Sequence, residues 1–223
     1  MLKAQQCCLC SQIEGRQSND LIARMLPDQP YIRRVMLESP SFAVIPSLGP
    51  LVLGHSLLCP KYHVRSFAAV PGDLHAEFRE ISACLRRALS EKYGNSIYLF
   101  EHGMAAAGGR ILCTVDHAHL HFLPLPRSFD GEVAADQRWT EFDGSPASLQ
   151  QIAGDREYIF YETPDGVCRL LTGELTLESQ YMRKLIAEGL GRAAHWNWRE
   201  TPDPQTADET WRHFALLPET SGE

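Results

Sequence analysis

Three histidines alternate with apolar residues in one short segment, and this spacing is the clearest sign of chemistry in the chain. The segment reads His117-Ala118-His119-Leu120-His121-Phe122. In an extended strand successive side chains point to opposite faces, so the imidazoles share one face and the apolar side chains share the other. At a rise of about 3.3 Å per residue, neighbouring imidazoles lie roughly 6.6 Å apart along that face. An apolar strand carrying such a face predicts metal binding, phosphate chemistry or both.

The cysteines divide into core thiols and one cluster near the N-terminus. Their number, seven, is odd, and the first residues carry no pattern of an export signal, so a disulfide framework is not expected. Cys59 and Cys84 lie in apolar patterns typical of buried thiols. Cys7 and Cys10 form a C-x-x-C pair, which is the spacing of a hairpin that supplies two ligands to structural zinc.

The composition describes an ordinary globular chain that is acidic overall. It has 223 residues, 44% hydrophobic content and a formal net charge of −7. This charge argues against a broad nucleic-acid surface, although a locally positive site for a small anion stays compatible with it. No apolar run approaches the roughly 20 residues that span a bilayer. We therefore expect a cytoplasmic protein with no membrane partner.

The elements that must position the histidines are short strands around one long helix. Apolar runs predict strands over 42–45, 51–59, 97–100 and 111–123, the last being the histidine strand. Proline residues at 46, 60 and 124 are predicted to end three of them. Between the second and third strands, apolar residues at helical spacing predict a helix that begins at Asp73 as N-cap and ends at Gly94.

The C-terminal part of the chain shows a second set of elements. Residues 128–154 are predicted to be a surface connection. The pattern then resumes with a strand over 158–161, a turn at Pro164-Asp165-Gly166, a partner strand over 167–171 and a helix over 176–189.

Two motifs in this order resemble the histidine triad (HIT) superfamily. The family signature H-φ-H-φ-H-φ-φ is matched by residues 117–123, and the upstream strand G-H-x-L-φ-φ-P-K-x-H resembles Gly54-His55-Ser56-Leu57-Leu58-Cys59-Pro60-Lys61-Tyr62-His63. The resemblance covers roughly residues 7–127. It implies an α+β fold in which an antiparallel sheet is flanked by helices.

The predicted organisation is a HIT-like catalytic domain over 1–127, a connecting segment over 128–157, and a C-terminal α+β extension over 158–223 that packs on the core. Members of the family are often homodimers, so a homodimer is one expectation. The extension could instead replace or block that interface, or its 179–183 segment could reach the active site. The sequence leaves these alternatives open.

The resemblance implies a two-step reaction at the α-phosphate of a nucleotide. The middle histidine, His119, is the implied nucleophile, and water then hydrolyses the nucleotidyl-imidazole intermediate. His121 and His55 are the implied imidazole donors, and Thr114 is a hydroxyl donor to the phosphate or the leaving group. The chemistry is also physically sound, because a neutral imidazole with a pKa near 6.5 offers a nucleophilic nitrogen at neutral pH.

The implied base pocket is a hydrophobic slot beside the first strands, for which Phe42, Val44 and Ile45 are the candidates. Packing in the core is the competing interpretation for each of them. His102 is assigned to the nucleotide pocket, although neither it nor Glu101 belongs to the minimal family pattern. The chain also departs from the pattern in the leaving-group contacts, since Cys113 stands where many members have Gln.

A structural zinc site is also implied by the resemblance. In zinc-containing branches, two histidines from the two motifs join two cysteines, and here these would be His63 and His117 with Cys7 and Cys10. Four protein ligands make such a zinc structural and leave the chemistry to His119. Cys8 with Cys10 is only a C-x-C pair and a poorer clamp, so Cys7 is preferred. The alternative is a cluster of free cysteines.

The predicted function is hydrolysis of a nucleoside phosphate derivative, namely a dinucleoside polyphosphate, a phosphoramidate or an adenylate. The first alternative is nucleotidyl transfer or phosphorolysis, and His121 favours the hydrolase because transferase branches commonly have Gln there. The second is a zinc-stabilised nucleotide-binding module without turnover, against which the intact triad argues.

Overall fold

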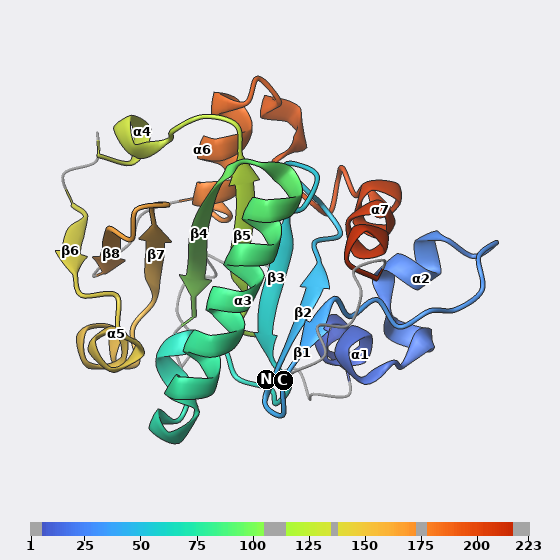
Figure 1. Cartoon of the computed structure of the whole chain (residues 1–223), viewed down its shortest axis with the longest axis horizontal. Helices are drawn as coiled ribbons and strands as arrows, with labels where there is room; N and C mark the ends of the chain where they lie inside the picture. Colours follow the sequence, from blue (N-terminus) through green and yellow to red (C-terminus); the bar gives the residue numbers. More distant parts are fainter. Residues whose placement is uncertain (1–5, 105–114, 135–137, 173–177, 216–223) are drawn as a thin grey trace.

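The chain folds around one antiparallel sheet with helices on both faces (Figure 1). The computed structural model describes residues 6–104, 115–134, 138–172 and 178–215. The order across its eight strands is β1-β2-β3-β5-β4-β7-β8-β6, and all neighbours are antiparallel. The predicted α+β class is confirmed. The strands are β1 (Leu37–Glu38), β2 (Phe42–Pro46), β3 (Ser56–Pro60), β4 (Ser96–Gly103), β5 (Leu120–Leu125), β6 (Thr140–Phe142), β7 (Tyr158–Glu162) and β8 (Cys168–Thr172).

The upstream motif forms a turn before it forms a strand, so β3 is shorter than predicted. The His55 N–H donates to the Val52 carbonyl at 3.2 Å, and this bond closes a turn where a strand was expected. Gly54 sits in this turn at φ +89°, and a Cβ there would lie 2.4 Å from the Tyr93 ring. The motif's glycine is therefore required both by its backbone conformation and by this close approach.

The histidine segment also enters its strand later than predicted. β5 begins at Leu120, so His121 lies on the strand while the first two triad histidines precede it. The physical reason is a backbone bond to a loop: the Ala118 N–H donates to the Val64 carbonyl at 2.7 Å instead of joining β3. Pro124 lies inside β5 and does not end it. Residues 111–114 lie outside the described part of the chain.

One face of the sheet is covered by α3 (His75–Tyr93) and α5 (Pro146–Ala153). Buried Ile81, Leu85 and Leu89 repeat at helical spacing on α3 and pack over β4 and β5. The helix ends as predicted, at Gly94 with φ +65°. It begins later than predicted, because Asp73 lies in a 3₁₀ turn (Gly72–Leu74) that precedes the helix and is not its N-cap.

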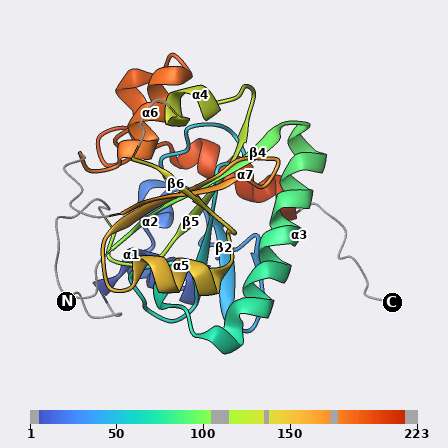
Figure 2. The same cartoon turned by 90° about the vertical axis from the view of Figure 1, so that its left-hand side faces the viewer.

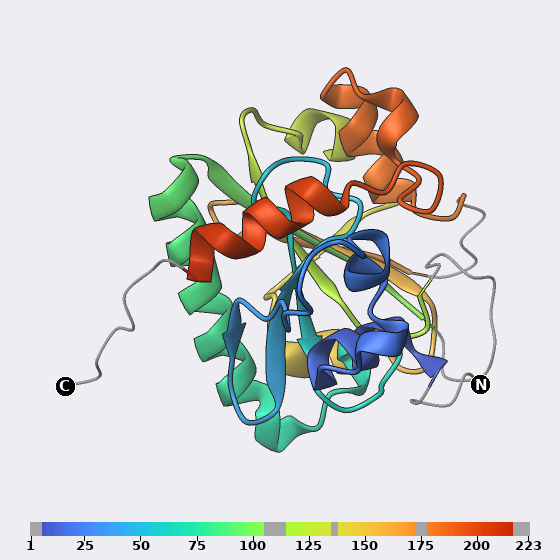
Figure 3. The same cartoon turned by 90° about the vertical axis from the view of Figure 1, so that its right-hand side faces the viewer.

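The opposite face is covered by elements from both ends of the chain (Figures 2 and 3). α1 packs on β2 and β3, α4 and α6 pack on β4, β5 and β7, and α7 lies beside α2 and β2. None of the described helices is long and apolar enough to cross a membrane. The bounds are α1 (Cys8–Glu14), α2 (Leu21–Met25), α4 (Asp130–Ala134), α6 (Tyr181–Gly189) and α7 (Pro204–Ala215).

The segment predicted to be a surface connection contains structure of its own. It holds α4, β6 and α5, and the buried side chains of Phe129, Leu149 and Ala153 explain why it packs. Beyond it, β7 pairs along β4 from Leu99 to Gly103. The strands of residues 138–172 thus continue the same sheet that carries the triad.

Candidate functional site

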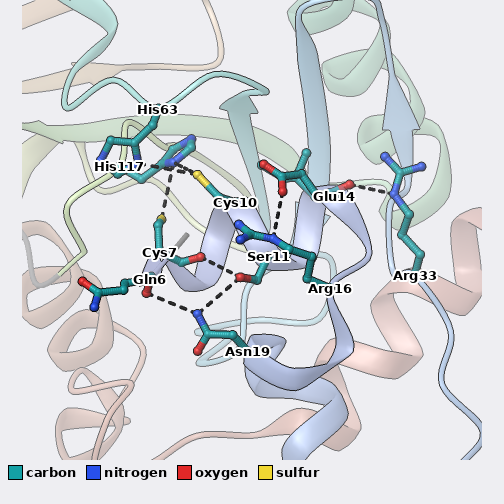
Figure 4. Close-up of polar contacts among 11 residues, drawn as sticks. Gln6, Cys7, Cys10, Ser11, Glu14, Arg16, Asn19, Arg33, His63 and His117 are labelled. Atoms are coloured by element: carbon teal, nitrogen blue, oxygen red, sulfur yellow. Dashed lines mark hydrogen bonds and ion pairs between the residues drawn. The ribbon is translucent and has the colours of Figure 1, made fainter. Parts of the chain in front are cut away.

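Two cysteines and two histidines meet beside the sheet and form a compact group of ligand atoms (Figure 4). One donor atom from each of Cys7, Cys10, His63 and His117 lies within 4.8 Å of the other three. Cys10 Sγ is 3.3 Å from His117 Nδ1 and 3.5 Å from His63 Nδ1. The first turn of α1 brings the two cysteines to one side, because residues three apart share a helix face. The cluster is therefore a Cys2His2 donor set.

The environment of the cluster directs its donor atoms inward. The His117 Nε2–H donates to the Pro60 carbonyl at 2.9 Å, which leaves the Nδ1 lone pair facing the cysteines. Hydrogen bonding from Cys10 and from His117 lowers the pKa of Cys7, whereas the neighbouring Cys7 raises the pKa of Cys10.

A second group of imidazoles forms a hydrogen-bonded pair with defined tautomers. The Leu51 N–H donates to His55 Nδ1 at 3.1 Å, so the proton of a neutral His55 lies on Nε2. That Nε2 is 2.8 Å from His121 Nδ1, which must then accept. The proton of His121 is consequently on its own Nε2, where it can be donated onward. Phe100 stacks on the His121 ring at 4.1 Å and holds its plane.

His119 is directed by its own backbone neighbour. Its Nδ1–H donates to the carbonyl oxygen of His117 at 2.6 Å, so the neutral ring carries its lone pair on Nε2. The ring centroid lies 5.0 Å from that of His121. The bond pattern thus sets a nucleophilic nitrogen on one imidazole beside a donor N–H on the next.

Burial keeps these rings neutral. Desolvation lowers the pKa of His55, His119 and His121, and the positive charge of Arg183 acts in the same direction on all three. His102 follows the same rule, because burial lowers its pKa to about 3. A neutral imidazole is the form that a nucleophile requires.

Glu101 is a buried carboxylate on β4 that interacts electrostatically with His119 of the triad. It accepts hydrogen bonds from the Phe67 N–H at 2.8 Å and from the Tyr158 hydroxyl. Burial raises its pKa to about 7, and its negative charge raises the pKa of His119. Any positive charge that develops on the His119 ring is therefore stabilised when Glu101 is ionised.

A cavity of about 60 Å³ lies beside the triad, and its wall comes from both halves of the chain. His102 lines it and accepts a hydrogen bond at Nε2 from the Met182 N–H, 3.2 Å away, at the start of α6. The sequence left open whether the 179–183 segment reaches the active site, and the structure brings Gln180 and Arg183 of that segment to the cavity wall. Trp198, which also lines the cavity, was not identified from the sequence, since its approach to the triad depends on distant strand pairing.

The structure places some predicted site residues elsewhere. Phe42 and Val44 are fully buried on the α3 face of the sheet and do not line the cavity beside the triad, so their assignment to a nucleotide pocket stays a prediction. Ile45 faces the triad side but packs in the core with Leu57 and does not line the cavity. Thr114 lies outside the described residues.

The comparisons with known proteins point to one family. Residues 32–127 match the family model described as the HIT domain. No curated protein matches the chain significantly.

Several solved structures are similar, all at low identity. A zinc-bound histidine triad family protein from Mycobacterium smegmatis is 24% identical, covering 57% of this chain and 80% of its own, with a TM-score of 0.40. A HIT family protein from Bacillus anthracis is 19% identical, covering 58% and 87%, with a TM-score of 0.41. A hypothetical histidine triad nucleotide-binding protein from Sulfolobus tokodaii is 19% identical, covering 48% and 68%, with a TM-score of 0.37.

TM-scores this low carry no argument about the family. The family match rests on the sequence: it covers both motifs and ends just beyond β5. The segment that it matches carries all three triad histidines, His55 and His63. The chain thus contains a segment, residues 32–127, that matches the HIT domain of the histidine triad superfamily.

Proposed function

We propose that this protein hydrolyses a nucleoside phosphate derivative at its α-phosphate through a nucleotidyl intermediate on His119. The substrate class is a dinucleoside polyphosphate, a phosphoramidate or an adenylate. The observation that carries the proposal is the tautomer pattern: His119 has its lone pair on Nε2 while His121 has its proton on Nε2. A nucleophile and a phosphate donor are thereby prepared on adjacent rings.

In the first step, His119 Nε2 attacks the α-phosphorus and the bond to the leaving group breaks with its electron pair going to that group. The His121 Nε2–H donates to a phosphoryl oxygen, on which negative charge accumulates. The ring of His119 becomes positively charged, and both the His117 carbonyl and the Glu101 carboxylate stabilise it. Covalent catalysis thus divides one difficult displacement into two easier ones.

In the second step, water attacks the same phosphorus and the P–N bond breaks. Its electron pair returns to His119 Nε2, which restores the neutral ring, and the water proton leaves to solvent. The product is a nucleoside monophosphate. Hydrolysis is favoured over transfer because the third triad position is a histidine, His121, and not Gln.

The Cys2His2 cluster suits one structural zinc ion, which Cys7, Cys10, His63 and His117 would hold. The donor chemistry fits, since two sulfur and two imidazole ligands are a common set for structural zinc. The outward Nε2–H of His117 is also fixed by a carbonyl, as ligating imidazoles usually are. When bound, the metal would fasten α1 to the segment that carries His119.

The proposal is tested by trapping the intermediate and by replacing the nucleophile. We expect mass spectrometry of a quenched reaction to locate a nucleotidyl adduct on His119. His119→Asn should fold and bind nucleotide but lose about 10³-fold or more in kcat, because only the covalent step is removed. An adduct on another residue, or turnover by His119→Asn at the wild-type rate, would overturn the mechanism.

Product analysis separates hydrolysis from its alternatives. The wild-type protein is incubated with adenylylated compounds, with and without inorganic phosphate. We expect AMP in both reactions. A nucleoside diphosphate that forms only with phosphate would identify a transferase, and binding without any product would identify a non-catalytic module.

A further inference from the structure

The cavity beside the triad contains one formal positive charge among its described residues, and that charge comes from the C-terminal part of the chain. Arg183 lies on α6 and is only 3% exposed. Its Nη2 donates to the Gly49 carbonyl at 2.6 Å, and its Nε donates to the Trp196 carbonyl at 2.8 Å. The guanidinium is therefore fixed in the wall before any ligand arrives, which is the arrangement that preorganised recognition requires.

The loop that contains Gly49 leaves room for Arg183 and the C-terminal segment to pack closely against it. At Gly49, a Cβ would lie 2.4 Å from the Trp198 Cβ and 3.2 Å from Arg183 Nη2. No side chain larger than hydrogen fits there unless the C-terminal segment moves. Glycine at this position thus allows α6 and the segment after it to reach the cavity.

Gln180, the N-cap residue that precedes α6, combines a strained backbone with a buried polar atom that has no hydrogen-bond partner among the described residues. Gln180 is a non-glycine residue in the left-handed region, at φ +61°, and it is only 4% exposed. Its Nε2 donates to Asn197 Oδ1 at 3.4 Å, while its Oε1 is buried and accepts no hydrogen bond within the described part of the chain. Both features lie in the wall of the same cavity as His119.

The electrostatics of the cavity define what Arg183 can do. The hydrogen bonds at their other ring nitrogens make His119 a nucleophile and His121 an N–H donor, whereas the formal charge of the described cavity wall comes from Arg183. A leaving group that departs as a phosphate anion gains charge as the bridging P–O bond breaks. A buried guanidinium suits such an oxyanion, because it offers charge and several N–H donors in a fixed plane.

We propose that Arg183, positioned by the strained start of α6, binds the departing phosphate and makes the site selective for nucleotides whose leaving group is a phosphate anion. This inference rests on the function proposed above and narrows its substrate class. The P–N bond to His119 forms, the bridging P–O bond breaks, and its electron pair stays on the oxygen that leaves beside Arg183. A phosphoramidate, whose leaving group is an amine, gains nothing from this cation.

The experiment compares three arginine variants of the full chain on two substrates. Arg183→Gln removes the proposed contact. Arg192→Gln is the matched control, because Arg192 Nη1 donates to the Leu51 carbonyl at 2.7 Å and ties the same segments together without lining the cavity. The substrates are a dinucleoside polyphosphate and a nucleoside phosphoramidate, and the readout is kcat/KM.

We expect Arg183→Gln to lower kcat/KM for the polyphosphate by about 10²–10³-fold and for the phosphoramidate by less than about tenfold. Arg183→Lys should recover part of the loss, and Arg192→Gln should change neither substrate by more than about threefold. Equal losses on both substrates would overturn the proposal, since they would show that Arg183 only supports the fold. Thermal unfolding of each variant identifies any that do not fold, and Arg183→Lys then replaces Arg183→Gln.

A binding measurement separates this proposal from the reaction itself. Calorimetric titration of His119→Asn with inorganic tripolyphosphate should give an affinity that falls at least about tenfold when Arg183→Gln is added. If the wild-type protein turns over neither nucleotide while this difference persists, the proposed reaction fails and the anion subsite stands. If nucleotides are turned over and the titration shows no difference, the subsite fails and the reaction stands.

Discussion

Each imidazole of the site is directed by the hydrogen bond on its other nitrogen. A backbone N–H fixes His55, His55 fixes His121, and the carbonyl of His117 fixes His119. Because a neutral ring has one proton, the partner of one nitrogen decides what the other can do. The functional roles at the site therefore depend on groups that never need to touch a substrate.

The hydrogen bond from His55 to His121, called the relay below, predicts how two substitutions of His55 change activity. His55→Leu removes the donor that keeps the His121 proton on Nε2, so we expect kcat to fall about 10–100-fold. His55→Gln can still donate to His121 Nδ1 and should stay within about tenfold of wild type. The measurement is steady-state hydrolysis with thermal unfolding as a check on folding. The control is His75→Leu, at the first residue of α3, which covers the other face of the sheet. Equal activity of the two His55 variants would contradict the relay.

Glu101 predicts a pH dependence of stability. Its carboxyl pKa is about 7 in the folded protein, whereas the ordinary value, which applies to the unfolded chain, is 4.5. Between pH 4.5 and pH 7 the folded state therefore binds more protons than the unfolded state. The free energy of unfolding should therefore fall as pH rises from 4.5 through 7. A shift of this size corresponds to about 3 kcal/mol at 1.36 kcal/mol per unit.

Urea unfolding at a series of pH values measures this effect. Glu101→Gln lacks the titrating group. Its free energy of unfolding, relative to that of the wild type, should therefore rise as pH increases from 4.5 to 7 and stay constant below pH 4.5. A difference between the two proteins that does not change with pH would show that Glu101 does not titrate there.

Sequence reasoning worked at the residue scale where residue type and local spacing carry the information. The triad and the four members of the Cys2His2 cluster were all named before the structure, and the structure brings each set together. It could not decide between pocket and core for Phe42 and Val44, because a strand buried on both faces has no polar side to mark which face would meet a pocket. The approach of the 179–183 segment, which contains Arg183, stayed one open alternative because only distant strand pairing decides it.

At the scale of elements, α1 matters because it joins the far N-terminal segment to the histidine loop. Cys10 and Cys7 come from this helix and its N-cap, while His63 and His117 come from loops beside β3 and β5. A metal that holds these four together would set the position of the carbonyl that directs His119. The cluster is thus mechanically linked to the nucleophile.

The cluster predicts metal dependence. Purified protein should contain about one zinc per chain, and Cys10→Ser should lose that zinc and unfold at a lower temperature, because metal binding is coupled to folding. Cys8→Ser is the matched control, since Cys8 is adjacent but lies outside the donor set. Elemental analysis and thermal unfolding make the comparison. Protein purified without chelator that holds no metal, or full zinc in Cys10→Ser, would refute the assignment.

The boundaries of elements were less predictable than their existence. Alternation of His and apolar residues indicated a strand from 111, yet β5 starts at Leu120 because a loop carbonyl from Val64 binds the Ala118 N–H. That competition involves a partner more than 50 residues away, which local patterns do not contain. The turn that occupies the first half of the predicted 51–59 strand is instead closed by a local bond, from the His55 N–H to the Val52 carbonyl.

At the scale of the whole molecule, one continuous sheet joins the two halves of the sequence. Five strands lie in or before the HIT domain match, and β7 continues them by pairing along β4. The apolar face of α6 then covers Tyr98, Phe100 and Leu123 on the sheet. Removing the C-terminal half would therefore open a strand edge and an apolar face together.

This arrangement predicts the effect of truncation. A chain that ends after residue 127 should be poorly soluble or self-associate through β4, and its triad should be inactive because the cavity wall is missing. A chain that ends after residue 215 keeps every described element and should behave as wild type. Solubility, size-exclusion chromatography and activity make the comparison. A soluble, monomeric and fully active 1–127 chain would contradict the prediction.

The pairing of β7 with β4 also has a consequence during synthesis. The triad half leaves the ribosome first, and the partner strand of β4 begins only at Tyr158. Because translation proceeds at about 5–20 residues per second, the edge of β4 stays unpaired for several seconds until β7 has been synthesised. During that interval two nascent chains on one polysome could pair with each other through the same edge. Chaperones that bind nascent chains, and spacing between ribosomes on the message, should therefore govern the yield of native protein.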